Sequence, residues 1–196
     1  MNPRRFKIIF FLGGIAALAL IGGVAFVSNQ EQDDQFCASC HTQPESEYLA
    51  RFQNALAQGR GIDLAAFHHR IQKASTRCID CHGGEGLLGR AQVITISALD
   101  AFKHYTGLAR QPAVIVIPVQ NEACIKCHED FVHKTGFENH MHNKMLDPDA
   151  PFLRCTDCHV THRQGDERNG FQFRDAIFPQ CEYCHVQMQK GPRGLK

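Results

Sequence analysis

The sequence predicts a mainly α-helical chain with much irregular coil, made of one N-terminal membrane-spanning helix and a domain with little conventional hydrophobic core. Three observations predict this class. An uncharged apolar run occupies residues 8–27, and all ten cysteines fall into five C-x-x-C-H motifs. The 149 residues from Cys37 to His185 are shared among these motifs, about 30 for each. So small a share cannot build a separate apolar core around every motif.

Composition excludes two broad classes. The chain has 196 residues, of which 43% are hydrophobic and 21% charged, so it is not wholly disordered. The formal net charge is only +1, which argues against a strongly basic nucleic-acid-binding protein.

The apolar run at residues 8–27 is long enough to cross a bilayer. At about 1.5 Å per residue it spans about 30 Å, the thickness of the hydrocarbon core. Three basic residues precede it and three acidic residues follow it, so the positive-inside bias places the N-terminus in the cytoplasm. A cleaved signal peptide, the alternative, has an apolar region of about 7–15 residues and a small-residue cleavage site. We therefore expect a single-pass anchor in the cytoplasmic membrane, with the remaining chain in the periplasm.

The domain boundaries follow from this anchor. Residues 1–30 are expected to form a cytoplasmic stub and the transmembrane anchor, and residues 31–189 a periplasmic domain. Residues 190–196 are basic and contain Gly and Pro, which predicts a flexible tail.

The cysteine motifs indicate a cofactor. They are Cys37-Cys40-His41, Cys78-Cys81-His82, Cys124-Cys127-His128, Cys155-Cys158-His159 and Cys181-Cys184-His185. C-x-x-C-H is the attachment signature of c-type haem. The two thiols bind the haem edge covalently, and the adjoining imidazole binds the iron. The sequence therefore predicts five covalently bound haem c groups, stacked so that they replace the missing core.

Other uses of these motifs fit less well. Structural zinc takes four ligands, so cysteine-only sites would use the motifs two at a time and leave one over. Disulfides need no neighbouring histidine. Thioredoxin-like pairs occur singly, in a βαβ context.

Seven further histidines are candidates for the second axial position on the irons. They are His68, His69, His104, His133, His140, His142 and His162. An iron with histidine on both faces suits electron transfer, whereas an open face binds a small molecule. We expect at least four of the seven to be ligands, with one member taken from the 68/69 pair and one from the 140/142 pair.

Local patterns predict three helices in the domain. Residues 46–58 carry one apolar face and stop at Gly59. Asp63 can cap a second helix that carries one or both of the adjacent histidines. A third helix is predicted over residues 87–105, ending near Gly107. The four consecutive β-branched residues at 93–96 have low helix propensity and weaken this prediction. Residues 112–118 are either a short strand or an apolar loop that touches the membrane.

Several segments together resemble the NapC/NirT/NrfH family of membrane-anchored multihaem cytochromes. The resemblance covers about residues 4–162. It is carried by the anchor and by residues 36–41, 78–83, 100–104, 121–124, 140–142, 155–159 and 162.

The resemblance implies a quinol dehydrogenase. Members of this family take electrons from menaquinol or ubiquinol and pass them to periplasmic reductases or cytochromes. Asp100 matches an acidic position beside the first haem and the quinol site. His104, His162 and the 140/142 pair sit where family members carry histidine, and the 68/69 pair lies in a segment that supplies a distal ligand.

The chain departs from the family pattern at three places. Gln43 stands where some members have Met, and Arg90 is the only basic residue where a Lys is expected. The fifth motif, at Cys181, extends a four-haem core. Pentahaem chains with one anchor are also similar to the cytochrome subunit of alternative complex III.

Two functions are therefore expected from the sequence. In the first, quinol approaches the haem of the first motif, Asp100 accepts a proton and Arg90 orients the quinol oxygen or a haem propionate. In the alternative, the chain is an electron-conducting subunit of a larger membrane complex and has no quinone site of its own. A haem-site reductase is disfavoured, because no C-x-x-C-K motif is present.

Overall fold

The computed structural model describes residues 3–73 and 75–195, and within them it is helical with no β-strand. The predicted mainly α-helical class is therefore confirmed. Met1, Asn2 and Lys196, at the ends of the predicted stub and tail, lie outside the described residues. The α-helices are α1 Pro3–Gln30, α2 Asp34–Cys40, α3 Glu45–Gln58, α4 Leu64–Ile71, α5 Cys78–His82, α6 Gly86–Tyr105, α7 Glu122–His133, α8 His140–Asn143, α9 Cys155–Cys158 and α10 Arg174–Gln187. The 3₁₀ helices are η1 Phe137–Asn139, η2 Lys144–Leu146 and η3 Glu167–Asn169.

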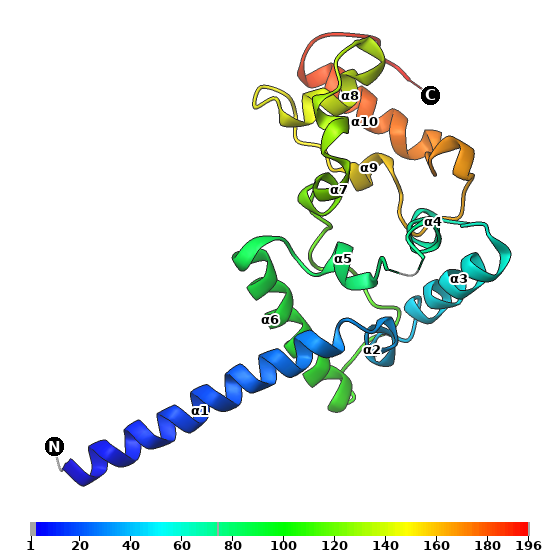
Figure 1. The fold of residues 1–196 in the computed structure, drawn as a ribbon. Helices are drawn as coiled ribbons and strands as arrows, with labels where there is room; N and C mark the ends of the chain where they lie inside the picture. Colours follow the sequence, from blue (N-terminus) through cyan, green and yellow to red (C-terminus); the bar gives the residue numbers. More distant parts are fainter. Residues whose placement is uncertain (1–2, 74, 196) are drawn as a thin grey trace.

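Helix α1 projects away from the rest of the molecule (Figure 1). Its segment Lys7–Gln30, 24 residues long with a mean hydropathy of 2.5, is entirely unburied. By length and composition this helix can cross a membrane, and it contains the run predicted at residues 8–27.

The three helices predicted for the domain are present as α3, α4 and α6. Helix α3 ends at Gly59, which adopts the left-handed conformation that glycine favours there (φ +66°). Helix α4 begins at Asp63, whose Oδ1 accepts a hydrogen bond from the backbone N–H of Ala66 at 2.8 Å. Helix α6 continues through its β-branched run, so the weak local propensity does not interrupt it.

The segment at residues 112–118 is coil and lies along the first motif. The Gln111 side chain donates from Nε2 to the Cys40 carbonyl at 3.0 Å, and the Ala113 N–H donates to the Gln43 carbonyl at 3.0 Å. The strand alternative is therefore wrong. Contact between this apolar loop and a membrane stays a prediction.

The same hydrogen bonds recur in two parts of the chain. Asp34, three residues before Cys37, accepts from the backbone N–H of Cys78 at 2.8 Å. Asn121, three residues before Cys124, accepts in the same way from the N–H of Cys155 at 2.8 Å. The first and second motifs, and the third and fourth, are thus joined by equivalent contacts even though the spacings differ.

A second repeated contact lies at the N-terminal end of the second and fourth motifs. The Asp80 carboxylate caps the N–H of Arg77 at 2.7 Å, and the Asp157 carboxylate caps the N–H of Arg154 at 2.8 Å. Both contacts arise from the shared sequence R-C-x-D-C-H, in which the carboxylate satisfies a free N–H at the helix start.

Conventional core is scarce in this fold. The buried hydrophobic residues in the described chain are few: Phe52, Ala55, Ala66, Ala123, Val132 and Phe171. The space between the helices is instead a continuous cavity of about 2240 Å³. A small-molecule pocket usually has about 300–1000 Å³, so this cavity has room for several large groups.

Candidate cofactor cavity and its histidine pairs

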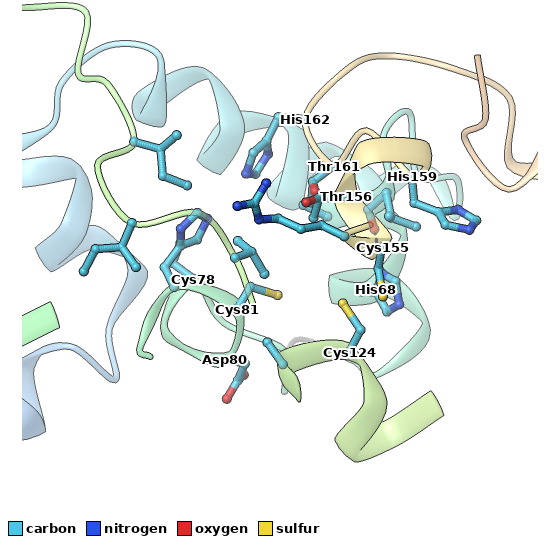
Figure 2. Close-up of a pocket in the computed structure, with 18 of the residues that line it drawn as sticks. His68, Cys78, Asp80, Cys81, Cys124, Cys155, Thr156, His159, Thr161 and His162 are labelled. Atoms are coloured by element: carbon cyan, nitrogen blue, oxygen red, sulfur yellow. Dashed lines mark hydrogen bonds between the residues drawn. The ribbon is translucent and has the colours of Figure 1, made fainter. Parts of the chain in front are cut away.

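All five motifs face the cavity. Its lining includes every motif cysteine and every motif histidine. Figure 2 shows part of this arrangement, with the thiols of Cys81, Cys124 and Cys155 directed into one space and His68 and His162 reaching it from other elements.

Short helices explain why both thiols of a motif point the same way. In each motif the two cysteines are three residues apart on a helix, in α2, α5, α7, α9 and α10. Residues at that spacing lie on the same helix face. The histidine follows at once: His41 and His159 cap the helix end, His128 lies at a kink and His185 lies within α10.

Thiol contacts connect the motifs into a row. Cys37 lies against Cys78, and the hydrogen bond between them lowers the pKa of Cys37 and raises that of Cys78. Cys124 and Cys155 form the equivalent pair, which lowers the pKa of Cys155. The first motif therefore adjoins the second, and the third adjoins the fourth.

Weaker electrostatic effects complete the row. Burial raises the pKa of Cys81, and the charge of nearby Cys124 adds to the effect. Burial raises the pKa of Cys158 to about 11, with Cys181 adding to it in the same way. The second motif thus lies near the third and the fourth near the fifth.

Four motif histidines each face a histidine from a distant part of the chain. The distances between ring centres are 6.2 Å for His82 and His162, 6.4 Å for His159 and His142, 6.2 Å for His185 and His140, and 5.9 Å for His128 and His68. The first three pairs have parallel ring planes, within 17°, and the fourth pair is nearly perpendicular at 85°.

The first three distances match the separation expected of two imidazoles that share one metal ion, and the fourth is slightly shorter. A metal–nitrogen bond is about 2.0–2.1 Å, and the ring centre lies roughly 1.1 Å behind the nitrogen, which puts two opposed ring centres about 6.2–6.4 Å apart. Among the described residues no three His, Cys, Asp or Glu side chains come together as a metal-binding group. Each imidazole pair could hold one metal ion between its two rings.

Backbone carbonyls fix the orientation of four of these rings. The Nδ1 atoms of His68, His140, His159 and His185 lie 2.5–3.2 Å from the carbonyl oxygens of Leu64, Phe137, Gly170 and Pro192. A carbonyl only accepts, so Nδ1 carries the proton and Nε2 keeps its lone pair for a metal. Metal-binding histidines usually make such a second bond.

Burial also favours the neutral form of four of the paired rings. It lowers the pKa of His82, His128 and His142, and it lowers the pKa of His162 to about 4, with the facing His82 ring adding to the effect. Neutral imidazole is the form that binds a metal.

The ring of His162 is held by residues that sequence reasoning missed. Tyr48 stacks on it with ring centres 4.0 Å apart and planes 7° apart. Arg51 donates from Nη1 to the His162 carbonyl at 2.7 Å and to the buried Asp63 carboxylate at 2.8 Å. No local motif marks Tyr48 or Arg51, because both act on a residue more than 100 positions away.

Three candidate histidines lie outside the cavity lining. His69 is buried, stacks on Phe52 with ring centres 4.6 Å apart, and has Nδ1 2.8 Å from the Thr76 carbonyl. His104 lies against Tyr105 on α6, and His133 is exposed at the end of α7. Thus one member of the 68/69 pair faces a motif, whereas both members of the 140/142 pair do.

The first motif differs from the other four. In residues 3–73 and 75–195, no second imidazole faces the ring of His41. The helix that carries this motif, α2, contacts α6. The cavity lining also includes apolar residues of α1 and α6, such as Val27 and Ile94, together with Ser97 and Asp100.

Of the two residues predicted for the quinol site, only Asp100 lines the cavity. Its Oδ1 lies 2.8 Å from Lys103 Nζ, so it is ion-paired. Arg90 is bound to the buried Glu31 carboxylate and to Ser28 Oγ at 3.3 Å, both near the C-terminal end of α1. Arg90 therefore links α6 to the anchor.

Two arginines line the cavity with unsatisfied polar atoms. The Nε atoms of Arg77 and Arg154 are buried and have no hydrogen-bond partner. Buried polar atoms normally have partners, so these guanidinium groups are suited to an anion inside the cavity. The repeated R-C-x-D-C-H sequence was the signal that could have found them.

Comparisons with protein-family models, with curated proteins and with solved structures find no match for this chain.

Proposed function

We propose that this chain is a membrane-anchored pentahaem c-type cytochrome that accepts electrons from membrane quinol and passes them to a periplasmic redox partner. The observation that carries the proposal is the set of four imidazole pairs, each joining a C-x-x-C-H histidine to a distant one at 5.9–6.4 Å between ring centres.

The residues around the cavity fit haem in three further respects. Both thiols of each motif share a helix face, which suits attachment to one haem edge. The cavity has room for several large groups. Arg77 and Arg154 offer buried positive charge where haem propionates need a partner.

Bound haem c supplies one-electron redox chemistry that no amino-acid side chain provides. The chain's own residues would bind the haems and set their positions relative to one another. The facing imidazole pairs would hold four of the haems, and a haem held by two histidines would suit electron transfer rather than ligand binding. Contacts from Cys37 to Cys78 and from Cys124 to Cys155 keep neighbouring sites close together.

The first motif is the proposed entry point. It lies beside the end of α1 and has no facing imidazole among the described residues, so a substrate from the membrane can approach it. Quinol oxidation releases two protons, and the Asp100 carboxylate is the proposed acceptor. Lys103 Nζ lies 2.8 Å from Asp100 Oδ1, so this contact would orient the carboxylate.

The test is quinol-driven haem reduction in the purified full-length protein. Asp100→Asn should slow reduction strongly while leaving dithionite reduction unchanged, because only the proton acceptor is lost. Asp130→Asn, at an exposed position on α7, is the matched control and should reduce at the normal rate. An unchanged rate in Asp100→Asn would remove Asp100 from the mechanism.

A second candidate is the electron-conducting subunit of a larger membrane complex. This alternative is favoured because Arg90 already binds Glu31 and Ser28. Its guanidinium group is therefore not available to bind quinol. This alternative predicts co-purification with a large integral membrane subunit in mild detergent and no quinol-driven reduction of the isolated chain.

The proposed location is the cytoplasmic membrane, with the haem domain in the periplasm. The apolar helix α1 supports the anchor, and the basic residues before it support the orientation. In this proposal, the haem groups are attached to the chain outside the cytoplasm.

A further inference from the structure

Helix α6 is apolar on two opposite sides. One side faces the cavity and includes Val93, Ile94 and Ala101. The opposite side has no charged residue at its centre and consists of Leu88, Ala91, Thr95, Leu99 and Phe102, with Leu87 and Tyr105 at its edge. A helix side without charged residues at its centre is normally covered by protein or lipid, so the outer side needs a cover.

The large side chains of this outer side are well exposed. Leu87 is 91% exposed, Leu88 88%, Phe102 62% and Tyr105 84%. None of them lines the cavity, so the groups proposed to fill that cavity would not cover them. Single exposed apolar residues are ordinary, but a row along a 20-residue helix marks a binding surface.

The position of α6 indicates what covers it. Arg90 joins α6 to Ser28 and Glu31, just beyond the apolar run of α1. Figure 1 shows α6 crossing α1 near the C-terminal end of that helix, on the side of the domain from which α1 projects. A bilayer spanned by α1 would therefore have its surface at the level of α6.

We propose that α6 is an interfacial helix whose outer side rests in the surface of the phospholipid bilayer. Its leucines and Phe102 would enter the boundary between headgroups and acyl chains, as amphipathic helices do to a depth of about 5–10 Å. Tyr105 would lie at the headgroups, where tyrosine is enriched. Lys103, at the edge of this side, can remain in water.

This contact would fix the height of the domain above the membrane. One helix alone lets a domain swing about its end, whereas α1 and α6 together give two lines of attachment. The first motif, on α2 against α6, would then be held at the depth of the bilayer surface. The inference goes beyond the proposed function, because it holds whether this chain oxidises quinol itself or only conducts electrons.

The test is photocrosslinking of the full-length protein in vesicles of phosphatidylethanolamine and phosphatidylglycerol. The photoreactive residue is placed by Leu88→p-benzoylphenylalanine and, in a separate variant, by Phe102→p-benzoylphenylalanine. Leu146→p-benzoylphenylalanine is the matched control, since Leu146 is also exposed (53%) but lies on η2, away from α1. Mass spectrometry identifies the adducts, and the absorbance of each variant reports whether the domain has assembled.

The expected result is phospholipid adducts at positions 88 and 102 and only background at position 146. The inference is overturned if lipid adducts are absent at 88 and 102, or equally frequent at all three positions. Adducts to a second polypeptide at 88 and 102 would also overturn it, because the outer side of α6 would then be a subunit interface. None of these outcomes depends on quinol oxidation, so a failure here is distinct from a failure of the proposed function.

Discussion

The adjacent histidines His68 and His69 on α4 have different surroundings. On α4, His68 faces His128 across the cavity with ring centres 5.9 Å apart. The next residue, His69, stacks on Phe52 in the small hydrophobic cluster. One step along a helix turns a side chain by about 100°, so adjacent histidines cannot share a site. The pair thus combines one candidate iron ligand with one core residue.

The facing histidines should control the spin state of bound iron. We predict that His162→Ala converts one low-spin haem to high-spin, because it removes the ring opposite His82 and leaves one iron face open. Electron paramagnetic resonance of the purified protein measures this change. His133→Ala, at an exposed position outside the cavity, should keep the spectrum of the parent protein. A spectrum for His162→Ala identical to that of the parent would contradict the assignment of this ligand.

Arg51 should matter for stability because it pairs with a buried carboxylate. The Arg51 side chain is 11% exposed and that of Asp63 is 1% exposed, and their atoms lie 2.8 Å apart. Removing one partner of a buried ion pair costs about 3–5 kcal/mol, since the other charge stays buried. We predict a loss of that size in the free energy of unfolding for Arg51→Ala, measured by guanidinium titration with circular dichroism.

The control for this measurement is Arg168→Ala. Arg168 pairs with Asp166 on the surface, where its side chain is 89% exposed. Exposed ion pairs contribute little to stability because water screens them, so little change is expected. Equal effects of the two substitutions would show that burial of the Asp63 carboxylate is not what makes Arg51 important.

At the scale of elements, the join between α1 and α6 is the contact that positions the domain on its anchor. It consists of Arg90, Glu31 and Ser28, and the Glu31 side chain is 6% exposed. Arg90→Ala would leave that carboxylate buried without its ion partner. We predict faster amide hydrogen exchange in the first turns of α6, measured in detergent by mass spectrometry.

Lys103→Ala provides the comparison on the same helix. It removes the exposed pair between Lys103 and Asp100, which joins no second element. The exchange of α6 should be unchanged in that variant. If both variants exchange alike, Arg90 does not hold α6 against α1.

The helices that the sequence predicted are those with local stop and start signals. Gly59 ends α3, Asp63 begins α4, and both signals act within a few residues. Helices α7 and α10 were not predicted, because each contains a C-x-x-C-H motif in place of an apolar stripe. Pro179 lies within α10, and proline is unfavourable in a helix interior.

The histidine pairing could be predicted only in outline. The composition showed that spare histidines were available, and the sequence predicted that at least four would be used. Which one faces which motif depends on long-range packing, such as that of Tyr48 and Arg51 around His162. The 140/142 pair shows this limit, since its members face His185 and His159, motifs 26 residues apart in the sequence.

At the scale of the whole molecule, the cavity takes the place of a core. Few hydrophobic side chains of the described chain are buried, and the small cluster around Phe52 is the main one. Burial of apolar surface is the dominant force in folding, so a cluster of this size cannot hold the domain together alone. The account therefore requires covalently attached groups to supply the missing contacts among the five motifs.

The most direct test of this claim is intact mass spectrometry of the purified full-length protein. The account predicts the mass of the polypeptide plus five haems, one for each C-x-x-C-H motif. A spectrum showing the bare polypeptide, or zinc in place of haem, would contradict it.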